Sequence, residues 1–182
     1  MHLGKGRRLT FESASPIELK IIIEGLQRFM NPGDIDSLLK DMHILIVHGR
    51  RLEAYLLSES LWSLYQSLKD WRHPYFIGLF LGEIRGKTLQ PSLHMCHKFS
   101  AEPRSEANVV VTPQGEQQFL YGKDLESNHL KKRLEEVNDH FEVLVLNQQG
   151  EALGFGKLEQ ERGGKMKLRN HRDLGWYLRR GG

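Results

Sequence analysis

The first hundred residues alternate between helix-like and strand-like patterns of apolar positions. Ser15-Pro16-Ile17-Glu18 forms a capping box with proline at the first helical position, which predicts a helix that ends at Asn31-Pro32-Gly33. The other elements that we expect here are a strand at 42–48, its hairpin partner at 52–57, a helix from Glu59 to about Asp70, and strands at 75–84 and 89–99. This mixture is typical of an α+β domain with an antiparallel sheet.

A polar, proline-containing segment at 100–107 follows, and we place the domain boundary there. We therefore expect an N-terminal α+β domain over residues 1–103 and a second domain over residues 107–182. In the second domain we expect strands at 108–112, 142–147, 152–159 and 165–169, with brief helices at 114–121 and 172–178. Many short strands with little helix suggest a small barrel.

Two expectations concern which residues are buried or aligned. In the helix after Ser58 the apolar side chains should face the core, namely Leu61, Trp62, Leu64, Tyr65 and Leu68. In the strand 89–99, His94 and Cys96 should point to one face and His97 to the other. Two ligands on one face do not make a zinc site, so we expect no metal.

The sequence offers little support for catalysis. Gly82 to Thr88 resembles a phosphate-binding loop, but only three residues separate its glycines where the Walker pattern needs four. The single cysteine, Cys96, excludes an internal disulfide and a multi-cysteine metal site. We therefore expect a binding protein and not an enzyme, without catalytic residues and without a cofactor. No apolar stretch approaches the length of a membrane helix, so we also expect an intracellular, cytoplasmic protein.

The charges are distributed unevenly. The chain has 26 Lys and Arg residues against 23 Asp and Glu residues, a formal net charge of +3. Seven basic side chains and one acid, Asp173, lie in residues 162–182, which gives this segment +6 and the rest of the chain −3. A basic segment on a mildly acidic body suggests a surface that binds a polyanion. The alternative is a solvated charged surface without a partner.

Three motifs carry a resemblance to a known family. They are 119–122 (Phe-Leu-Tyr-Gly), 153–156 (Leu-Gly-Phe-Gly) and 173–179 (Asp-Leu-Gly-Trp-Tyr-Leu-Arg). Together they resemble a PUA domain, in the variant found in the Nip-seven family of large-ribosomal-subunit biogenesis proteins. Residues 51–59, 79–84 and 93–99 are similar to the N-terminal half of that family.

The resemblance implies a C-terminal PUA-type β pseudo-barrel that binds RNA, with a preference for single-stranded, uridine-rich RNA. It implies a non-catalytic assembly factor in pre-rRNA processing and large ribosomal subunit biogenesis, located in the nucleus or nucleolus if the source is eukaryotic. We expect other ribosome assembly factors to bind the N-terminal domain of a monomer. Two alternatives stay open: an accessory subunit of an RNA-modifying enzyme, and a protein–protein adaptor with a basic docking face.

The candidate RNA-binding residues lie mostly near the C-terminus. Lys165, Lys167 and Arg169 alternate in a predicted strand and so share one face, opposite Met166 and Leu168. Arg172 follows just past that strand. At the end of the chain, Arg179 and Arg180 either extend this basic face or compensate the dipole of the last helix.

Aromatic and loop residues complete the candidate set. The resemblance places Tyr121 and Lys123 at a helix–loop junction that PUA domains turn toward RNA. Gly122, between them, is expected to need a positive φ or a close backbone approach. Trp176 is a residue on which a base could stack, but the compact Leu174-Gly175 step before it favours a place in the core.

Overall fold

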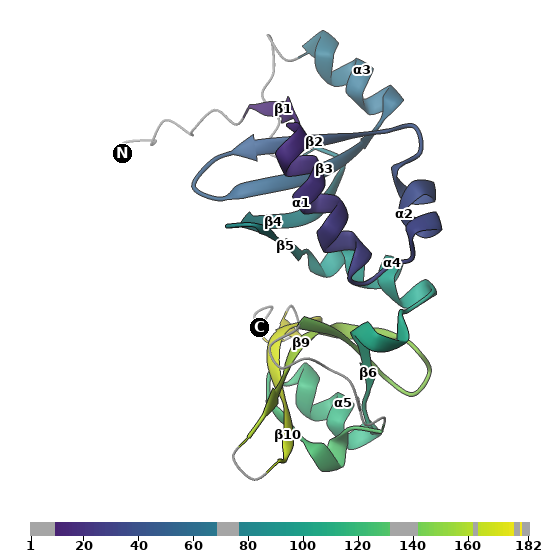
Figure 1. The fold of residues 1–182 in the computed structure, drawn as a ribbon, viewed down its shortest axis with the longest axis vertical. Coiled ribbons are helices and arrows are strands. Elements are labelled where there is room, and N and C mark those ends of the chain that lie inside the picture. The colour runs from purple at the N-terminus through teal and green to yellow at the C-terminus, as the bar shows by residue number, and fades with distance from the viewer. Residues whose placement is uncertain (1–9, 69–76, 132–141, 162–163, 177–178, 180–182) are drawn as a thin grey trace. The chain divides into compact units, whose positions relative to one another are not determined.

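The computed structural model describes residues 10–68, 77–131, 142–161, 164–176 and 179, and the chain forms two compact units (Figure 1). The first unit comprises Met1–Gln27 and Pro32–Ser92, and the second comprises Arg28–Asn31 and Leu93–Gly182. The division thus falls at Leu93, N-terminal to the polar segment in which the sequence places the boundary. No helix in the described ranges is long and apolar enough to cross a membrane.

The first unit is built on a five-stranded antiparallel sheet in the order β1-β2-β3-β4-β5. Its elements are β1 (Phe11–Ser13), α1 (Pro16–Gln27), α2 (Pro32–Leu39), β2 (Met42–His48), β3 (Leu52–Ser58), α3 (Glu59–Leu68), β4 (Leu79–Arg85) and β5 (Thr88–Pro91). The predicted antiparallel sheet with helices is therefore confirmed. The sequence did not predict β1, whose Phe11 is buried and contacts the rings of Tyr55 and Tyr65 edge-on.

Helix α1 begins at the predicted capping box. The Ser15 hydroxyl donates to Glu18 Oε2 at 2.6 Å, and the Ser15 backbone N–H donates to the same oxygen at 2.8 Å. Ile22 and Leu26 are fully buried. The helix lies close to β5, because a Cβ at Gly25 would stand 2.4 Å from the Leu89 Cβ.

The predicted strand 89–99 is wrong beyond Pro91. Proline has no N–H for the strand ladder, and the next residue turns the chain, since the Ser92 hydroxyl donates to the Phe80 carbonyl at 2.6 Å. A single 3₁₀ turn, Leu93–Met95, leads into α4 (Cys96–Ala101). Met95, Cys96 and Phe99 share its buried side, so the histidines and Cys96 of this segment do not lie on a strand. Burial raises the pKa of the Cys96 thiol to about 12.

The expected core face of α3 is also wrong in part. Tyr65 is buried against Phe11 and the sheet, and Trp62 packs against the same cluster. Leu61, Leu64 and Leu68, however, are 42%, 53% and 43% exposed. The helix therefore uses a narrow stripe for packing and leaves an apolar ridge on its outer side.

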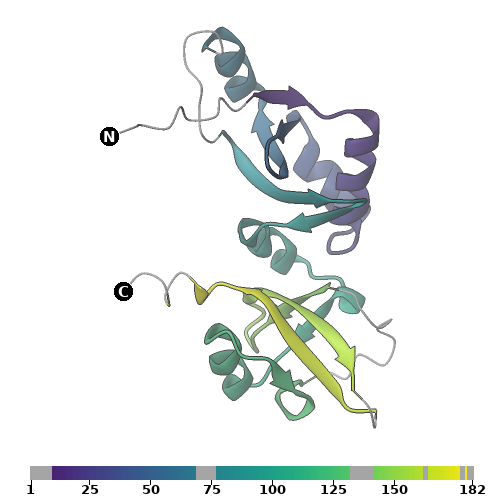
Figure 2. The same cartoon turned by 90° about the vertical axis from the view of Figure 1, so that its left-hand side faces the viewer.

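The second unit is a curled sheet in the order β6-β8-β9-β10-β7 (Figure 2). Its elements are η2 (Ser105–Ala107), β6 (Asn108–Val110), α5 (Pro113–Leu120), β7 (Leu125–Glu126), η3 (Ser127–His129), β8 (Glu142–Leu146), β9 (Ala152–Gln160) and β10 (Met166–Asp173). β6 pairs with β8 in parallel, and the other pairs are antiparallel. The predicted C-terminal pseudo-barrel is confirmed.

Helix α5 packs on the inner face of this curled sheet. Thr112 caps it by accepting a hydrogen bond from the Gly115 N–H at 3.1 Å, and Pro113 occupies the first helical position. Phe119 is fully buried among Val143, Leu158 and other apolar residues of the strands. The opposite face of the sheet holds Phe155, which is also buried, against Phe29 and Phe99 at ring distances of 5.4 and 6.1 Å.

Candidate nucleic-acid interface

The outer face of β9 and β10 carries the predicted basic residues. Leu158 and Leu168 are direct cross-strand partners, and both point into the core. Because side chains alternate along a strand, Lys167 and Arg169 point outward, beside their partners Glu159 and Lys157. The predicted alternation is thus confirmed for Lys167 and Arg169. Lys165 is exposed and precedes the first residue of β10.

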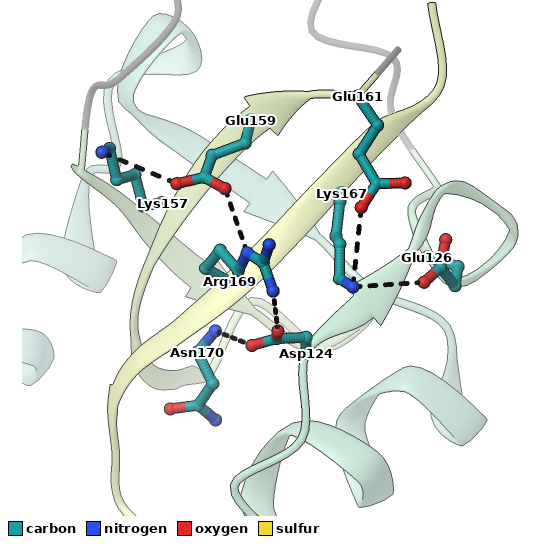
Figure 3. Close-up of polar contacts among 8 residues, drawn as sticks. All are labelled: Asp124, Glu126, Lys157, Glu159, Glu161, Lys167, Arg169 and Asn170. Atoms are coloured by element: carbon teal, nitrogen blue, oxygen red, sulfur yellow. Dashed lines mark hydrogen bonds and ion pairs between the residues drawn. The ribbon is translucent and has the colours of Figure 1, made fainter. Parts of the chain in front are cut away.

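Acidic side chains from other segments neutralise this face (Figure 3). Arg169 donates through Nη1 to Asp124 at 2.7 Å and through Nε to Glu159 at 3.0 Å. Lys167 Nζ lies 3.6 Å from Glu161 Oε1 and 3.7 Å from Glu126 Oε1. With Lys157 paired to Glu159, three cations here meet four carboxylates. The charge of +6 counted along the C-terminal segment is therefore not the charge of this surface.

The hydrogen bonds of this network shift the pKa values of its members. Burial by itself would raise the pKa of Asp124, but bonds from the Asn170 N–H, at 2.9 Å, and from Arg169 outweigh it and lower that pKa. The bond from Arg169 also lowers the pKa of Glu159. Bonds to Asp124 and Glu159 in turn raise the pKa of Arg169. Each of the three groups consequently stays charged at neutral pH.

A β-bulge sets the direction of Arg172. Asn170 lies opposite Gly156 and Arg172 opposite Phe155, so His171 is an extra residue in β10. The bulge returns Arg172 to the outer face that Arg169 occupies. There its guanidinium lies 4.9 Å from the Phe155 ring centroid, and Nη2 donates to Glu142 at 2.6 Å. Arg172 was expected just past the strand, but it lies within β10.

Arg179 is bound within the second unit. Its guanidinium donates to both carboxylate oxygens of Asp173, at 2.8 and 3.0 Å, and also to the Leu120 carbonyl at the end of α5. Asp173 is only 3% exposed. The hydrogen bond to Asp173 raises the pKa of Arg179. The sequence assigned Arg179 to the basic face or to the last helix, whereas its contacts cap α5. Arg180 lies outside the described residues.

Tyr121 and Lys123 lie where α5 ends. Tyr121 is the C-cap residue and is 63% exposed, and Lys123 is also exposed. Gly122 between them has φ of 78°, as expected for the turn. Within the described part of the chain, Lys123 and Lys165 are the cationic candidates that have no ion pair.

Trp176 lies on the surface, so its expected place in the core is wrong. It is 44% exposed, and Leu174 is 38% exposed. Gly175 explains both values, because a Cβ there would stand 2.0 Å from the Leu120 carbonyl oxygen. The glycine faces inward against α5, and its two neighbours turn outward. The predicted helix 172–178 is also wrong at its start, since Arg172 and Asp173 belong to β10.

The sequence reasoning missed the acidic partners of this surface. Asp124 and Glu126 sit on or just before the two-residue strand β7, which pairs with β10 and which no pattern predicted. Glu159 lies two residues after Lys157 in a predicted strand, so the sequence indicated that both side chains point to the same face. The sequence did not indicate which strand lies beside them. In the described ranges, no group of three or more His, Cys, Asp or Glu side chains is arranged to hold a metal ion.

Known proteins resemble this chain over most of its length. The UPF0113 proteins of Aeropyrum pernix and Archaeoglobus fulgidus are 29% identical over 162 residues and 28% identical over 178 residues. These matches cover 88% and 94% of this chain, and 87% and 95% of the relatives.

Two solved structures share the fold. A hypothetical protein from Pyrococcus horikoshii OT3 has a TM-score of 0.59 at 16% identity, covering 93% of this chain and 99% of that one. A conserved PUA domain protein from Thermoplasma acidophilum has a TM-score of 0.54 at 15% identity, covering 91% and 96%. Residues 12–93 match the model of the NIP7/UPF0113 pre-PUA domain, and residues 107–182 match the model of the UPF0113 PUA domain. The chain therefore belongs to the NIP7/UPF0113 family and carries that family's C-terminal PUA domain.

Proposed function

We propose that this protein is a non-catalytic assembly factor that binds single-stranded, uridine-rich RNA and acts in pre-rRNA processing and large ribosomal subunit biogenesis. Membership of the NIP7/UPF0113 family, with its PUA domain, supports RNA binding. The observation that supports an RNA-binding surface at this place is the row of cations along β10 and in the neighbouring turn after α5. The protein acts as a monomer in the cytoplasm, or in the nucleus and nucleolus of a eukaryote.

The two unpaired lysines make the first phosphate contacts in this proposal. Lys123 and Lys165 are exposed, so a phosphate reaches them without displacing a carboxylate. Lys167 and Arg169 lie between them along β10 and β7, about 7 Å apart as alternate strand residues. A phosphate at Arg169 competes with Glu159 and Asp124, so Arg169 adds less affinity than an unpaired cation would. Tyr121, Arg172, Arg179 and Arg180 complete the proposed contact set.

The test is the salt dependence of RNA binding, measured by fluorescence anisotropy with labelled uridine-rich and adenine-rich RNA. Each phosphate contact adds roughly −0.7 to the log–log slope of affinity against salt concentration, so Lys123→Gln with Lys165→Gln should make the slope shallower by roughly 1.4. The control exchanges Lys40 and Lys87, two exposed lysines of the first unit, for Gln. It removes the same charge and should leave the slope unchanged.

The other possible results of this binding experiment favour different functions. Equal slopes for the two double variants would move the RNA contacts away from β10. Absence of RNA binding by the unmodified protein would refute the proposed function and favour a protein–protein adaptor. A cofactor-dependent change in the mass of the RNA would instead favour the accessory subunit of a modifying enzyme.

Other assembly factors bind the first unit in this proposal. The supporting observation is the apolar ridge of α3, formed by Leu61, Leu64 and Leu68, because exposed apolar side chains aligned on one helix are typical of protein contacts. Leu64→Glu should abolish association with pre-ribosomal particles and leave RNA affinity intact. Ile17→Glu, at an apolar residue of α1 that is 74% exposed, is the matched control. If both variants associate equally well with the particles, the ridge is not the contact.

A further inference from the structure

Three residues with exposed apolar side chains lie on two segments that meet at the end of α5. Tyr121, Leu174 and Trp176 are 63%, 38% and 44% exposed, and we call them the stacking surface. They come from two distant segments that meet there, because a Cβ at Gly175 would stand 2.0 Å from the Leu120 carbonyl oxygen. Large apolar side chains cost free energy in water, so such a group indicates a binding site more than scattered residues do.

We infer that the stacking surface binds an unpaired nucleobase of RNA, with Trp176 and Tyr121 as the aromatic contacts. This inference rests on the proposed function and adds a base-binding site to its phosphate contacts. Aromatic side chains beside cations are the usual means by which proteins hold single-stranded nucleic acid without reading its sequence. In duplex RNA the base faces are covered by their neighbours, so the surface selects single strands.

Cations adjoin the stacking surface on the side of α5. Lys123 is exposed and lies two residues after Tyr121. The Arg179 guanidinium lies over Gly122, since a Cβ there would stand 3.0 Å from Arg179 Nη2. A base on the aromatic rings would thus have cations within reach of its flanking phosphate. This charge favours RNA over an apolar protein segment as the occupant.

The backbone beneath the stacking surface is held in place. The Leu174 N–H donates to the Leu153 carbonyl at 2.9 Å, and the Arg179 N–H donates to the Gly175 carbonyl at 3.0 Å. On the other segment, the Tyr121 N–H donates to the Gln117 carbonyl at 3.1 Å. Because these backbone groups are already hydrogen-bonded, binding a base costs little for ordering them.

The experiment compares two labelled probes, a short oligouridylate and an abasic oligonucleotide of the same length. Trp176→Leu keeps the charge and removes the aromatic ring, so it should weaken oligouridylate binding by roughly five- to a hundredfold. It should leave abasic binding and the salt slope unchanged, because no phosphate contact is lost. Ile17→Ala, at a residue 74% exposed in the first unit, is the control and should bind both probes normally.

Tryptophan fluorescence provides a second measurement of base binding. Oligouridylate should quench part of the emission of the unmodified protein, and Trp176→Leu should lose that part. Tyr121→Leu provides an independent variant should Trp176→Leu fold poorly, and it should weaken oligouridylate binding selectively as well.

The outcomes separate this inference from the proposed function. Equal loss on both probes, or unchanged affinity in both folded variants, would overturn the stacking surface while RNA binding itself stands. Unchanged RNA affinity would then assign the surface to a protein partner. Failure of the unmodified protein to bind either probe would remove the proposed function, and this inference with it.

Discussion

Removing two carboxylates beside Lys167 should strengthen RNA binding. Glu126→Gln with Glu161→Gln leaves Lys167 in place and eliminates the charges 3.7 and 3.6 Å from its ammonium group. Both acids are exposed, so the ion pairs contribute little to stability and the variant should fold normally. The lysine then meets an incoming phosphate without a competing partner.

The gain follows from Coulomb's law in water. A phosphate on Lys167 would lie roughly 6 to 7 Å from each carboxylate, where two unit charges repel by about 0.6 kcal/mol before salt screening. Screening at physiological salt removes about half of this. The two acids also compete for the lysine, and the combined effect is roughly 1 kcal/mol, or about fivefold tighter binding.

Fluorescence anisotropy with uridine-rich RNA measures this gain, first in low salt and then at physiological salt. The control is Glu12→Gln with Glu24→Gln, which changes the net charge equally in the first unit and should bind as the unmodified protein does. Unchanged or weaker binding by the Glu126 and Glu161 variant would refute the reasoning. It would show that the carboxylates position Lys167 for RNA or that no phosphate binds there.

Three further predictions concern stability. Asp173→Asn removes a buried carboxylate that a guanidinium binds through both oxygens, so it should cost about 2–4 kcal/mol, seen as a lower Tm. Gly175→Ala should lower the urea midpoint because its Cβ would strike the Leu120 carbonyl, whereas Gly33→Ala, with open space around it, should not. The folded-state pKa of Asp124 is lowered, so its stabilisation is complete above the unfolded pKa of about 4 and disappears as pH falls through the folded value. Tm should fall over that range, and Asp124→Asn should flatten the decline.

Local patterns predicted the elements that depend on neighbouring residues. The apolar run 42–48 and the capping box at Ser15 both appear as expected in β2 and α1. The alternation around Leu168 placed Lys167 and Arg169 outward because period 2 needs no knowledge of the rest of the fold. By contrast, residues 93–99 are apolar enough for a strand or a buried helix, and periodicity in so short a run does not separate the two.

Contacts between distant segments were beyond the sequence reasoning. Arg169 meets Asp124 across 45 positions, and Arg172 meets Glu142 across 30. The two-residue strand β7 that carries one side of the network is too short to leave a pattern. The surface direction of Trp176 likewise depends on the Leu120 carbonyl filling the space beside Gly175. Charge counted along a segment therefore overstated the charge of the face it forms.

The bulge at His171 gives β10 one residue that its pairing with β9 does not need. Its side chain is exposed, so most substitutions there should be tolerated. Deleting the residue would restore regular alternation and leave Arg172 opposite Phe155 and Asp173 opposite Gly154, on the faces that they already occupy. The contacts of Arg172 with Glu142 and of Asp173 with Arg179 should therefore survive the deletion. Related chains in which β10 is one residue shorter at this point should keep the same outer face.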